Sequence, residues 1–200
     1  TGDSLSRVRV LLAEDDENAR TLLIDLLGTL GHVVVGEAST GRDAVERAKR
    51  AHPDVVLLDV HMPDGSGIEA AEEIALALPG TGVVLFSGDE SLTLTDRDVT
   101  ATSAIAFLPK PVPPRVLDST LRLAARRARD LSVARADADS ARRQLEHRKT
   151  IERAKGILMR RTGTSEQEAY RILQRSSQDR SVPMVDIARA VLDSEPEARA

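Results

Sequence analysis

The sequence predicts an α/β fold, a doubly wound five-stranded parallel sheet, followed by a long helix and a small three-helix bundle. Two observations predict it. Short apolar runs alternate with helical patterns as far as residue 114, whereas only helical patterns follow. The charge changes at the same place: residues 1–114 carry 19 acidic and 9 basic side chains, a net −10, and residues 115–200 carry 13 and 19, a net +6. An acidic half followed by a basic half indicates two functional parts.

The apolar runs of the first half predict its strands. Short, continuous apolar runs are typical of parallel strands that are buried on both faces. Between them, apolar residues recur at helical spacing. The runs comprise residues 8–13, 33–35, 55–58, 83–86 and 105–108, and the intervening helices are expected near residues 22–30, 44–51 and 68–78. In this architecture the chemistry lies beyond the carboxyl ends of the strands.

The chain after Pro114 predicts one long helix. Leucine and alanine recur at spacings of three and four as far as Leu145, and neither glycine nor proline interrupts residues 115–155. Such a helix can pack on its own domain, or it can form a coiled coil with a second chain through a thin, alanine-rich seam. The pattern alone leaves both possibilities open.

Three helices are expected in the last fifty residues. Gly163 closes the first, and Ser165 with Glu168 forms a capping box at the start of the second. Pro183 suits the first turn of the third. We therefore expect a first domain over residues 1–114, a helical linker over 115–147, a three-helix domain over 148–194 and a tail over 195–200.

Composition excludes several classes of protein. With 41% hydrophobic and 30% charged residues the chain is typical of a soluble globular protein. It contains no apolar run of the ~18 residues that a membrane span needs, and no basic-then-apolar leader opens it, so we expect no membrane association. The absence of cysteine excludes disulfides, thiolate zinc sites and cysteine nucleophiles, and fits a cytoplasmic protein.

Three carboxylates form the first candidate site. Glu14, Asp15 and Asp59 all follow apolar runs, and they converge if the first and third strands are neighbours. Carboxylates crowded together repel one another, so that one is protonated or a divalent cation is bound. Oxygen ligands without His or Cys favour Mg²⁺. The alternative is that these acids merely cap the following helices, as we expect of Asp16.

Two further polar residues extend this site. Ser87 ends the fourth apolar run, and Lys110 follows the fifth, so that a hydroxyl and an ammonium reach the same edge of the sheet. A carboxylate beside Mg²⁺, a hydroxyl and a lysine can hold a phosphoryl group. Asp59 can then act as a nucleophile and form an aspartyl phosphate. No glycine-lysine phosphate loop and no GxGxxG motif occurs, so nucleotide binding has no support.

The order and spacing of four motifs resemble the receiver domain of two-component response regulators over most of the first half. These motifs are residues 11–16 (LLAEDD), 58–67 (LDVHMPDGSG), 86–87 (FS) and 109–111 (PKP). The resemblance implies that Asp59 is the phosphoacceptor for a sensor histidine kinase. It also implies that the receiver assists its own Mg²⁺-dependent phosphorylation and dephosphorylation, without being an enzyme in the usual sense.

The resemblance further assigns metal ligands. Asp15 and Asp59 would bind Mg²⁺ through their carboxylates, and Glu14 would act mainly through water. His61 would contribute its backbone carbonyl. Its imidazole is not expected to be a ligand, because members of the family carry varied residues at that position.

The resemblance also assigns a switch and exposes one departure from the family. Ser87 and Phe107 stand where receivers carry their switch residues, and Lys110 stands at the phosphate-binding lysine. However, Ser103-Ala104 replaces the usual Gly-Ala before the fifth strand. The preceding segment, residues 92–102, is rich in threonine and has low helix propensity.

The last part of the chain resembles an ANTAR domain, the RNA-binding module of transcription antitermination regulators. The resemblance rests on residues 148–159 (RKTIERAKGILM), 168–175 (EAYRILQR) and 185–191 (VDIARAV). A receiver, a long helix and an ANTAR domain in this order are similar to actinobacterial antiterminator response regulators. The resemblance implies binding to a pair of short hairpin loops in a nascent leader transcript, which would prevent formation of a terminator.

Basic residues on the predicted C-terminal helices are compatible with RNA, because cations track a phosphate backbone and arginine planes stack on unpaired bases. The candidate RNA contacts are Arg148, Lys149, Arg153, Lys155, Arg160, Arg161, Tyr170, Arg171 and Arg175. The alternatives are a merely solvated basic face, a Tyr170 buried in the bundle, and a helical domain that binds DNA or a protein partner instead. Pairing of two chains through the long helix predicts a phosphorylation-dependent homodimer.

Overall fold

The computed structural model describes residues 7–63, 65–88 and 104–194. The chain divides into two compact units, Thr1–Ala134 and Arg135–Ala200, and helix α5 (Pro114–Thr162) contributes residues to both. The finer boundaries expected after residues 114, 147 and 194 stay predictions. Among the residues that the structure describes, no helix combines the length and apolar character that a membrane crossing requires.

The first unit contains the predicted five-stranded sheet, with strands in the order β2-β1-β3-β6-β7 and every neighbouring pair parallel. The strands are β1 (Arg9–Ala13), β2 (Val33–Ala38), β3 (Val55–Asp59), β6 (Gly82–Ser87) and β7 (Ala106–Pro109). Strand order reverses between β1 and β3, and a ligand-binding crevice is expected outside their carboxyl ends. A short hairpin of β4 (His61–Met62) and β5 (Gly65–Ser66), which the sequence did not predict, follows β3.

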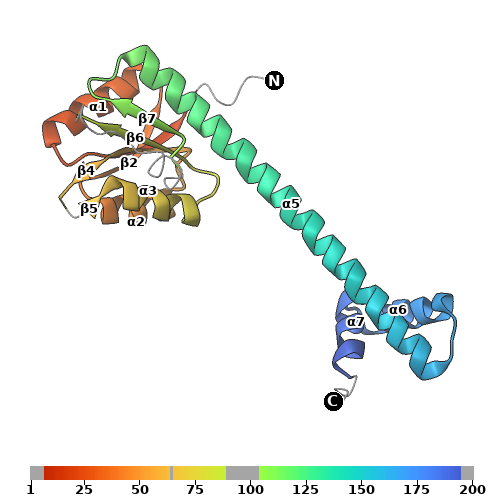
Figure 1. Cartoon of the computed structure of the whole chain (residues 1–200). Helices are drawn as coiled ribbons and strands as arrows, with labels where there is room; N and C mark the ends of the chain where they lie inside the picture. The colour runs from red at the N-terminus through yellow and green to blue at the C-terminus, as the bar shows by residue number, and fades with distance from the viewer. Residues whose placement is uncertain (1–6, 64, 89–103, 195–200) are drawn as a thin grey trace. The chain divides into compact units, whose positions relative to one another are not determined.

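Helices cover both faces of this sheet (Figure 1). Helices α2 (Gly41–Ala51) and α3 (Gly67–Ala77) pack on one face, and α1 (Glu17–Thr29) with the start of α5 packs on the other. The side chain of Asp16 accepts a hydrogen bond from the Ala19 amide at 2.7 Å, which confirms that it caps α1. The segment expected to depart from the family, residues 92–103, lies outside the described residues.

Helix α5 has different surroundings along its 49 residues. In the first unit, Leu117, Leu121 and Ala124 are buried in the core against the sheet. Leu131 and Leu145, which continue the same seam, are each 53% exposed. Packing on its own domain therefore accounts for the first part of the seam, and the later part is left uncovered.

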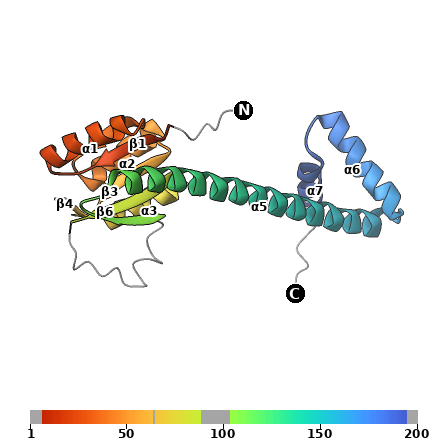
Figure 2. The same cartoon turned by 90° about the horizontal axis from the view of Figure 1, so that it is seen from above.

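The second unit is a small helical core. The last turns of α5 pack with α6 (Glu166–Arg180) and α7 (Met184–Asp193), and α7 lies beside α5 in both views (Figures 1 and 2). The expected helix ends are confirmed. Gly163 has a φ of 67° just beyond α5, and the Ser165 hydroxyl accepts from the Glu168 amide to cap α6. Pro183 occupies the N-cap of α7, one residue before the expected first turn.

Substitution of Gly82 tests how tightly α5 packs on the sheet. A Cβ at this position would lie 2.8 Å from the Ala124 carbonyl oxygen, which belongs to rigid helix backbone. We expect Gly82→Ala to lower the free energy of unfolding by about 1–3 kcal/mol, because the helix must shift to accept the methyl group. Urea unfolding of the full chain measures this. Gly80→Ala is the control, because its Cβ would meet only Ser132 Oγ at 3.6 Å. Equal stability of the two variants would contradict the tight packing.

His32 makes the first unit sensitive to acid. Its side chain is fully buried, its Nδ1 accepts from the Val8 amide at 3.3 Å, and its Nε2 lies 3.0 Å from Asp118 Oδ1 in poor alignment for a hydrogen bond. Burial lowers the pKa of His32, and the nearby charge of Arg122 adds to this, whereas Asp118 opposes it only in part.

The folded chain therefore binds a proton at His32 less readily than the unfolded chain, whose imidazole has its ordinary pKa of 6.5. Stability from this residue is complete above that pH and is lost as the pH falls below it. We expect His32→Gln to flatten the decline in unfolding free energy between pH 7.5 and 5.5 in urea titrations. His147→Gln, at an exposed position of α5, is the control. An unchanged slope in the His32 variant would refute the role of the buried imidazole.

Candidate functional site

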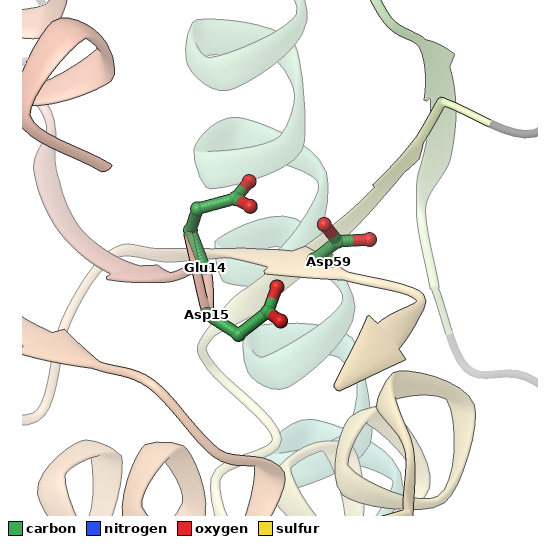
Figure 3. Close-up of side chains that lie close together, drawn as sticks. All are labelled: Glu14, Asp15 and Asp59. Carbon is green, nitrogen blue, oxygen red and sulfur yellow. The ribbon is translucent and has the colours of Figure 1, made fainter. Parts of the chain in front are cut away.

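The three predicted carboxylates converge at the carboxyl ends of β1 and β3 (Figure 3). Glu14 and Asp15 follow β1, Asp59 ends β3, and one oxygen from each lies within 4.8 Å of the others. Glu14 and Asp59 are buried, whereas Asp15 is exposed. Buried carboxylates this close repel strongly unless cations compensate them. Hard oxygen donors in one cluster fit Mg²⁺, so this group of residues can hold a divalent cation.

Lys110 supplies one of the cations. Its Nζ lies 2.6 Å from Glu14 Oε2 and 2.5 Å from Asp59 Oδ2, and it sits 4.4 Å from the centre of the Phe86 ring. The Lys110 amide donates to the Ser87 carbonyl at 2.7 Å, which fixes the start of the loop that carries the ammonium. The Lys110–Pro111 peptide bond is cis. A lysine and two carboxylates at the ends of three different strands are therefore in direct contact.

The electrostatics of the cluster follow from burial and from this lysine. Burial raises the pKa of the Glu14 carboxyl; Lys110 opposes the rise, and the neighbouring charge of Asp59 adds to it. For Lys110, burial acts to lower the pKa, but the hydrogen bonds to Asp59 and Glu14 outweigh it and raise the pKa. The ammonium thus stays charged at neutral pH. One ammonium compensates only part of the charge of three carboxylates, so the cluster can accommodate a further cation.

The remaining predicted residues of this site lie around Asp59. The His61 amide donates to Asp59 Oδ1 at 3.0 Å, and the His61 imidazole Nδ1 is 3.4 Å from Ser87 Oγ. Ser87 itself is buried at the end of β6. Phe107 is half-buried in β7, where it packs against the core beneath α2 and α3. Ser87 is thus near the carboxylates, and Phe107 belongs to the neighbouring edge strand.

Three residues that shape the site were not singled out from the sequence. Gly67 begins α3, and a Cβ there would lie 1.9 Å from the Asp59 carbonyl oxygen, so only glycine fits. Arg20 donates to the Glu14 carbonyl at 2.8 Å and holds the turn after β1. Phe86 lies beneath the Lys110 ammonium. Gly67 and Phe86 stand within motifs that the sequence displays, but the contacts of Phe86 and Arg20 depend on tertiary packing.

The C-terminal unit exposes most of the predicted RNA contacts. Those with exposed side chains are Arg148, Lys149, Arg153, Arg160, Arg161, Tyr170, Arg171 and Arg175. Lys149 and Arg171 lie within 4 Å of Glu146 and Glu168 respectively, in exposed pairs that contribute little free energy. Tyr170 is 43% exposed, which excludes its burial in the bundle. It borders a shallow hollow of about 500 Å³ that Lys155, Gln167 and neighbouring residues line.

Two of the predicted contacts are engaged within the unit. The Lys155 side chain is only 9% exposed, and its Nζ lies 2.8 Å from Glu152 and 2.7 Å from Glu166. It therefore joins α5 to the start of α6. Arg161 donates to the Ser194 hydroxyl at 2.9 Å and to the Ser194 carbonyl at 2.6 Å, so that it fastens the end of α7 to α5. Neither contact was visible in the sequence pattern.

Comparison with known proteins gives two family matches. Residues 10–122, more than half of the chain, match the response regulator receiver domain. Residues 139–192 match the ANTAR domain. The receiver match contains every residue of the carboxylate and lysine cluster, and the ANTAR match contains all of the predicted RNA contacts.

Individual relatives agree with these matches. The chain is 37% identical over 187 residues to the transcriptional regulatory protein PdtaR of Mycobacterium tuberculosis. The aligned region covers 93% of this chain and 90% of that protein. It is 34% identical over 114 residues to the chemotaxis protein CheY of Thermotoga maritima, covering 56% of this chain and 92% of that protein. Among solved structures, the receiver domain of NarL from Mycobacterium tuberculosis matches with a TM-score of 0.55 and 29% identity over 60% of this chain and 98% of that one. Similarity that runs through both units shows the family: this chain belongs to the response regulators that join a receiver domain to an ANTAR domain.

Proposed function

We propose that phosphoryl transfer to Asp59 controls RNA binding by the ANTAR unit and, through it, transcription antitermination. One observation carries the first half of this proposal: Lys110 contacts both Asp59 and Glu14 in a three-carboxylate cluster at the point where strand order reverses. The ANTAR match and the exposed basic helices support the second half.

Asp59 is suited to be the nucleophile. In the proposed step an Asp59 carboxylate oxygen bonds to the phosphorus of a phosphohistidine on a sensor kinase, the phosphorus–nitrogen bond breaks, and the imidazole leaves with a proton. Lys110 then exchanges its carboxylate contacts for a phosphoryl oxygen. Mg²⁺ held by Asp15, Asp59, the His61 carbonyl and, through water, Glu14 would neutralise charge on the phosphoryl oxygens.

Ser87 and Phe107 are proposed to carry the signal outward. The Ser87 hydroxyl, now 3.4 Å from the His61 imidazole, would donate instead to a phosphoryl oxygen on Asp59. Movement of Ser87 at the end of β6 frees space that the half-buried Phe107 of the adjacent β7 can enter. Because the chain continues from β7 into α5, such a change reaches the helix that leads to the ANTAR unit.

The seam of α5 is suited to pair two chains once the receiver is phosphorylated. Leu131 and Leu145 are exposed, and the small residues Ala134, Ala138 and Ala141 lie between them. A seam of this kind buries little area, so a dimer through it would be weak and reversible. Two ANTAR units held together bind paired hairpin loops with higher avidity, without any new contact to RNA. A nascent leader transcript is the proposed ligand, and such a transcript would be met in the cytoplasm.

Phosphorylation of Asp59 is testable with acetyl phosphate and Mg²⁺. We expect the full chain to gain one phosphoryl group, measured by intact-mass spectrometry, and Asp59→Asn to gain none, because an amide cannot form the acyl phosphate. Asp16→Asn is the matched control, since its asparagine still caps α1 and should leave labelling unchanged. Labelling of the Asp59 variant at the parental level would reject the site.

The choice of nucleic acid is testable by competition. We expect the phosphorylated full chain to prefer a short RNA hairpin, selected from a pool with a randomised loop, over a DNA duplex of equal length at the same salt concentration. Arg175→Gln should weaken RNA binding and reduce the slope of log K against log salt by about 0.7 to 0.9, the value for one phosphate contact. Exposed Arg142, outside the predicted contacts, supplies the control Arg142→Gln.

Two outcomes would favour the other interpretations of the ANTAR unit. Preference for the duplex would indicate a DNA-binding domain. Binding to neither nucleic acid, together with salt-insensitive binding to a protein partner, would indicate a protein-interaction module.

A further inference from the structure

Gly156 occupies an unexpected place in the second unit. It lies in the interior of α5, where glycine is one of the least favourable residues. Among the described residues, only the flexible Arg160 guanidinium would come within 4 Å of an added Cβ, at 3.7 Å. By contrast, Gly82 is required by the helix packed against it, and Gly163 adopts a positive φ where the helix ends. Neither reason applies to Gly156.

The side of α5 that carries Gly156 points away from the core of the unit. The core side presents Ile151, Ala154 and Leu158 to α6 and α7. Lys149, Arg153 and Arg160 stand seven and three residues before Gly156 and four residues after it, spacings that place them on the same face of a helix. All three are exposed. We call these four residues the Gly156 face.

The charge of this face is positive. Glu152, the acidic residue nearest to it along the helix, lies 2.8 Å from Lys155, which also contacts Glu166, so its charge is compensated in part. Lys149 is paired with Glu146 only in an exposed contact, which water and salt screen. The Arg153 side chain makes no hydrogen bond or ion pair within the part of the chain that the structure describes. Lys149, Arg153 and Arg160 thus flank a position where the helix surface carries no side chain.

We propose that the Gly156 face is the site where the ribose–phosphate backbone of RNA approaches α5 most closely. This rests on the RNA-binding function proposed above. The missing side chain lets a sugar and its phosphates touch the helix surface, and Arg153 and Arg160 on either side contact the phosphate oxygens. The packing of the chain does not require glycine at position 156, and close approach of the RNA backbone would explain why glycine stands there.

Charge favours RNA over a second copy of this chain as the occupant. In a symmetric pair, each Gly156 face would lie against the same face of the partner and bring like charges together. An RNA backbone has the opposite charge and releases counterions when lysine and arginine neutralise it. The apolar seam around Leu131 and Leu145 offers a second copy a different and uncharged surface.

The test substitutes Gly156→Ala in the full-length chain, phosphorylated with acetyl phosphate and Mg²⁺. The probe is one RNA hairpin selected on the parental protein from a pool with a randomised loop. Gly28→Ala is the matched control: Gly28 is also a helical glycine, it is exposed in α1, and a Cβ there would meet nothing within 4 Å. Both changes should raise the temperature at which the helical signal is lost, because alanine favours helix.

RNA binding should separate the two variants. Gly156→Ala is expected to weaken hairpin affinity at least about tenfold, equivalent to about 1.4 kcal/mol, whereas Gly28→Ala binds like the parent. Arg153→Gln should lower the slope of log K against log salt by about 0.7 to 0.9, as expected for one lost phosphate contact. A more stable protein that binds RNA less well cannot be attributed to misfolding.

Three results would overturn the proposal in distinguishable ways. If Gly156→Ala binds the hairpin as tightly as the parent, the Gly156 face is not a contact, although RNA binding stands. If parent and control also bind no hairpin from the pool, the proposed function itself fails. If Gly156→Ala changes sedimentation without RNA and leaves RNA affinity intact, the face belongs to an interface between two copies.

Discussion

The receiver unit depends on how charge is balanced at one edge of its sheet. Parallel strands that are apolar throughout leave their polar chemistry to the carboxyl ends, where β1, β3 and the loop after β7 bring Glu14, Asp59 and Lys110 into contact. Unit charges 4 Å apart interact by about 4 kcal/mol at an effective dielectric constant of 20. One ammonium therefore offsets only part of the repulsion among three acids. The uncompensated charge suits the cluster to hold a cation, and in the proposed function such a cation would offset the charge of an entering phosphoryl group.

Helix α5 shows how a single element serves two units. Its first turns complete the hydrophobic core on one face of the receiver sheet, and its last turns form part of the ANTAR core. Between Leu131 and Lys149 every residue except Ser132 and Ser140 is exposed. Helix propensity must keep this stretch helical, because tertiary packing does not and the Lys149–Glu146 pair at its end is exposed. The same stretch is therefore the part whose environment can change without disturbing either core.

The sequence was sufficient for the sheet, the convergence of Glu14, Asp15 and Asp59, and most helix ends, because these follow from local periodicity, capping residues and the geometry of parallel strands. It could not separate the basic residues of the ANTAR unit by role. Lys155 and Arg161 share the spacing of their neighbours, yet tertiary contacts to Glu166 and Ser194 occupy them. Periodicity finds the face of a helix, but only the folded chain shows what that face meets.

The contact between Arg161 and Ser194 has a practical consequence for work with this protein. The Arg161 guanidinium donates to both the hydroxyl and the carbonyl of Ser194, which directly follows α7. These two hydrogen bonds attach the end of α7 to α5. Affinity tags and fluorescent reporters joined beyond Ser194 leave this anchor in place. Truncations that remove Ser194 are instead expected to release the final turn of α7, where Val191 packs against the core. The choice of fusion point thus decides whether a reporter measures the native unit or a frayed one.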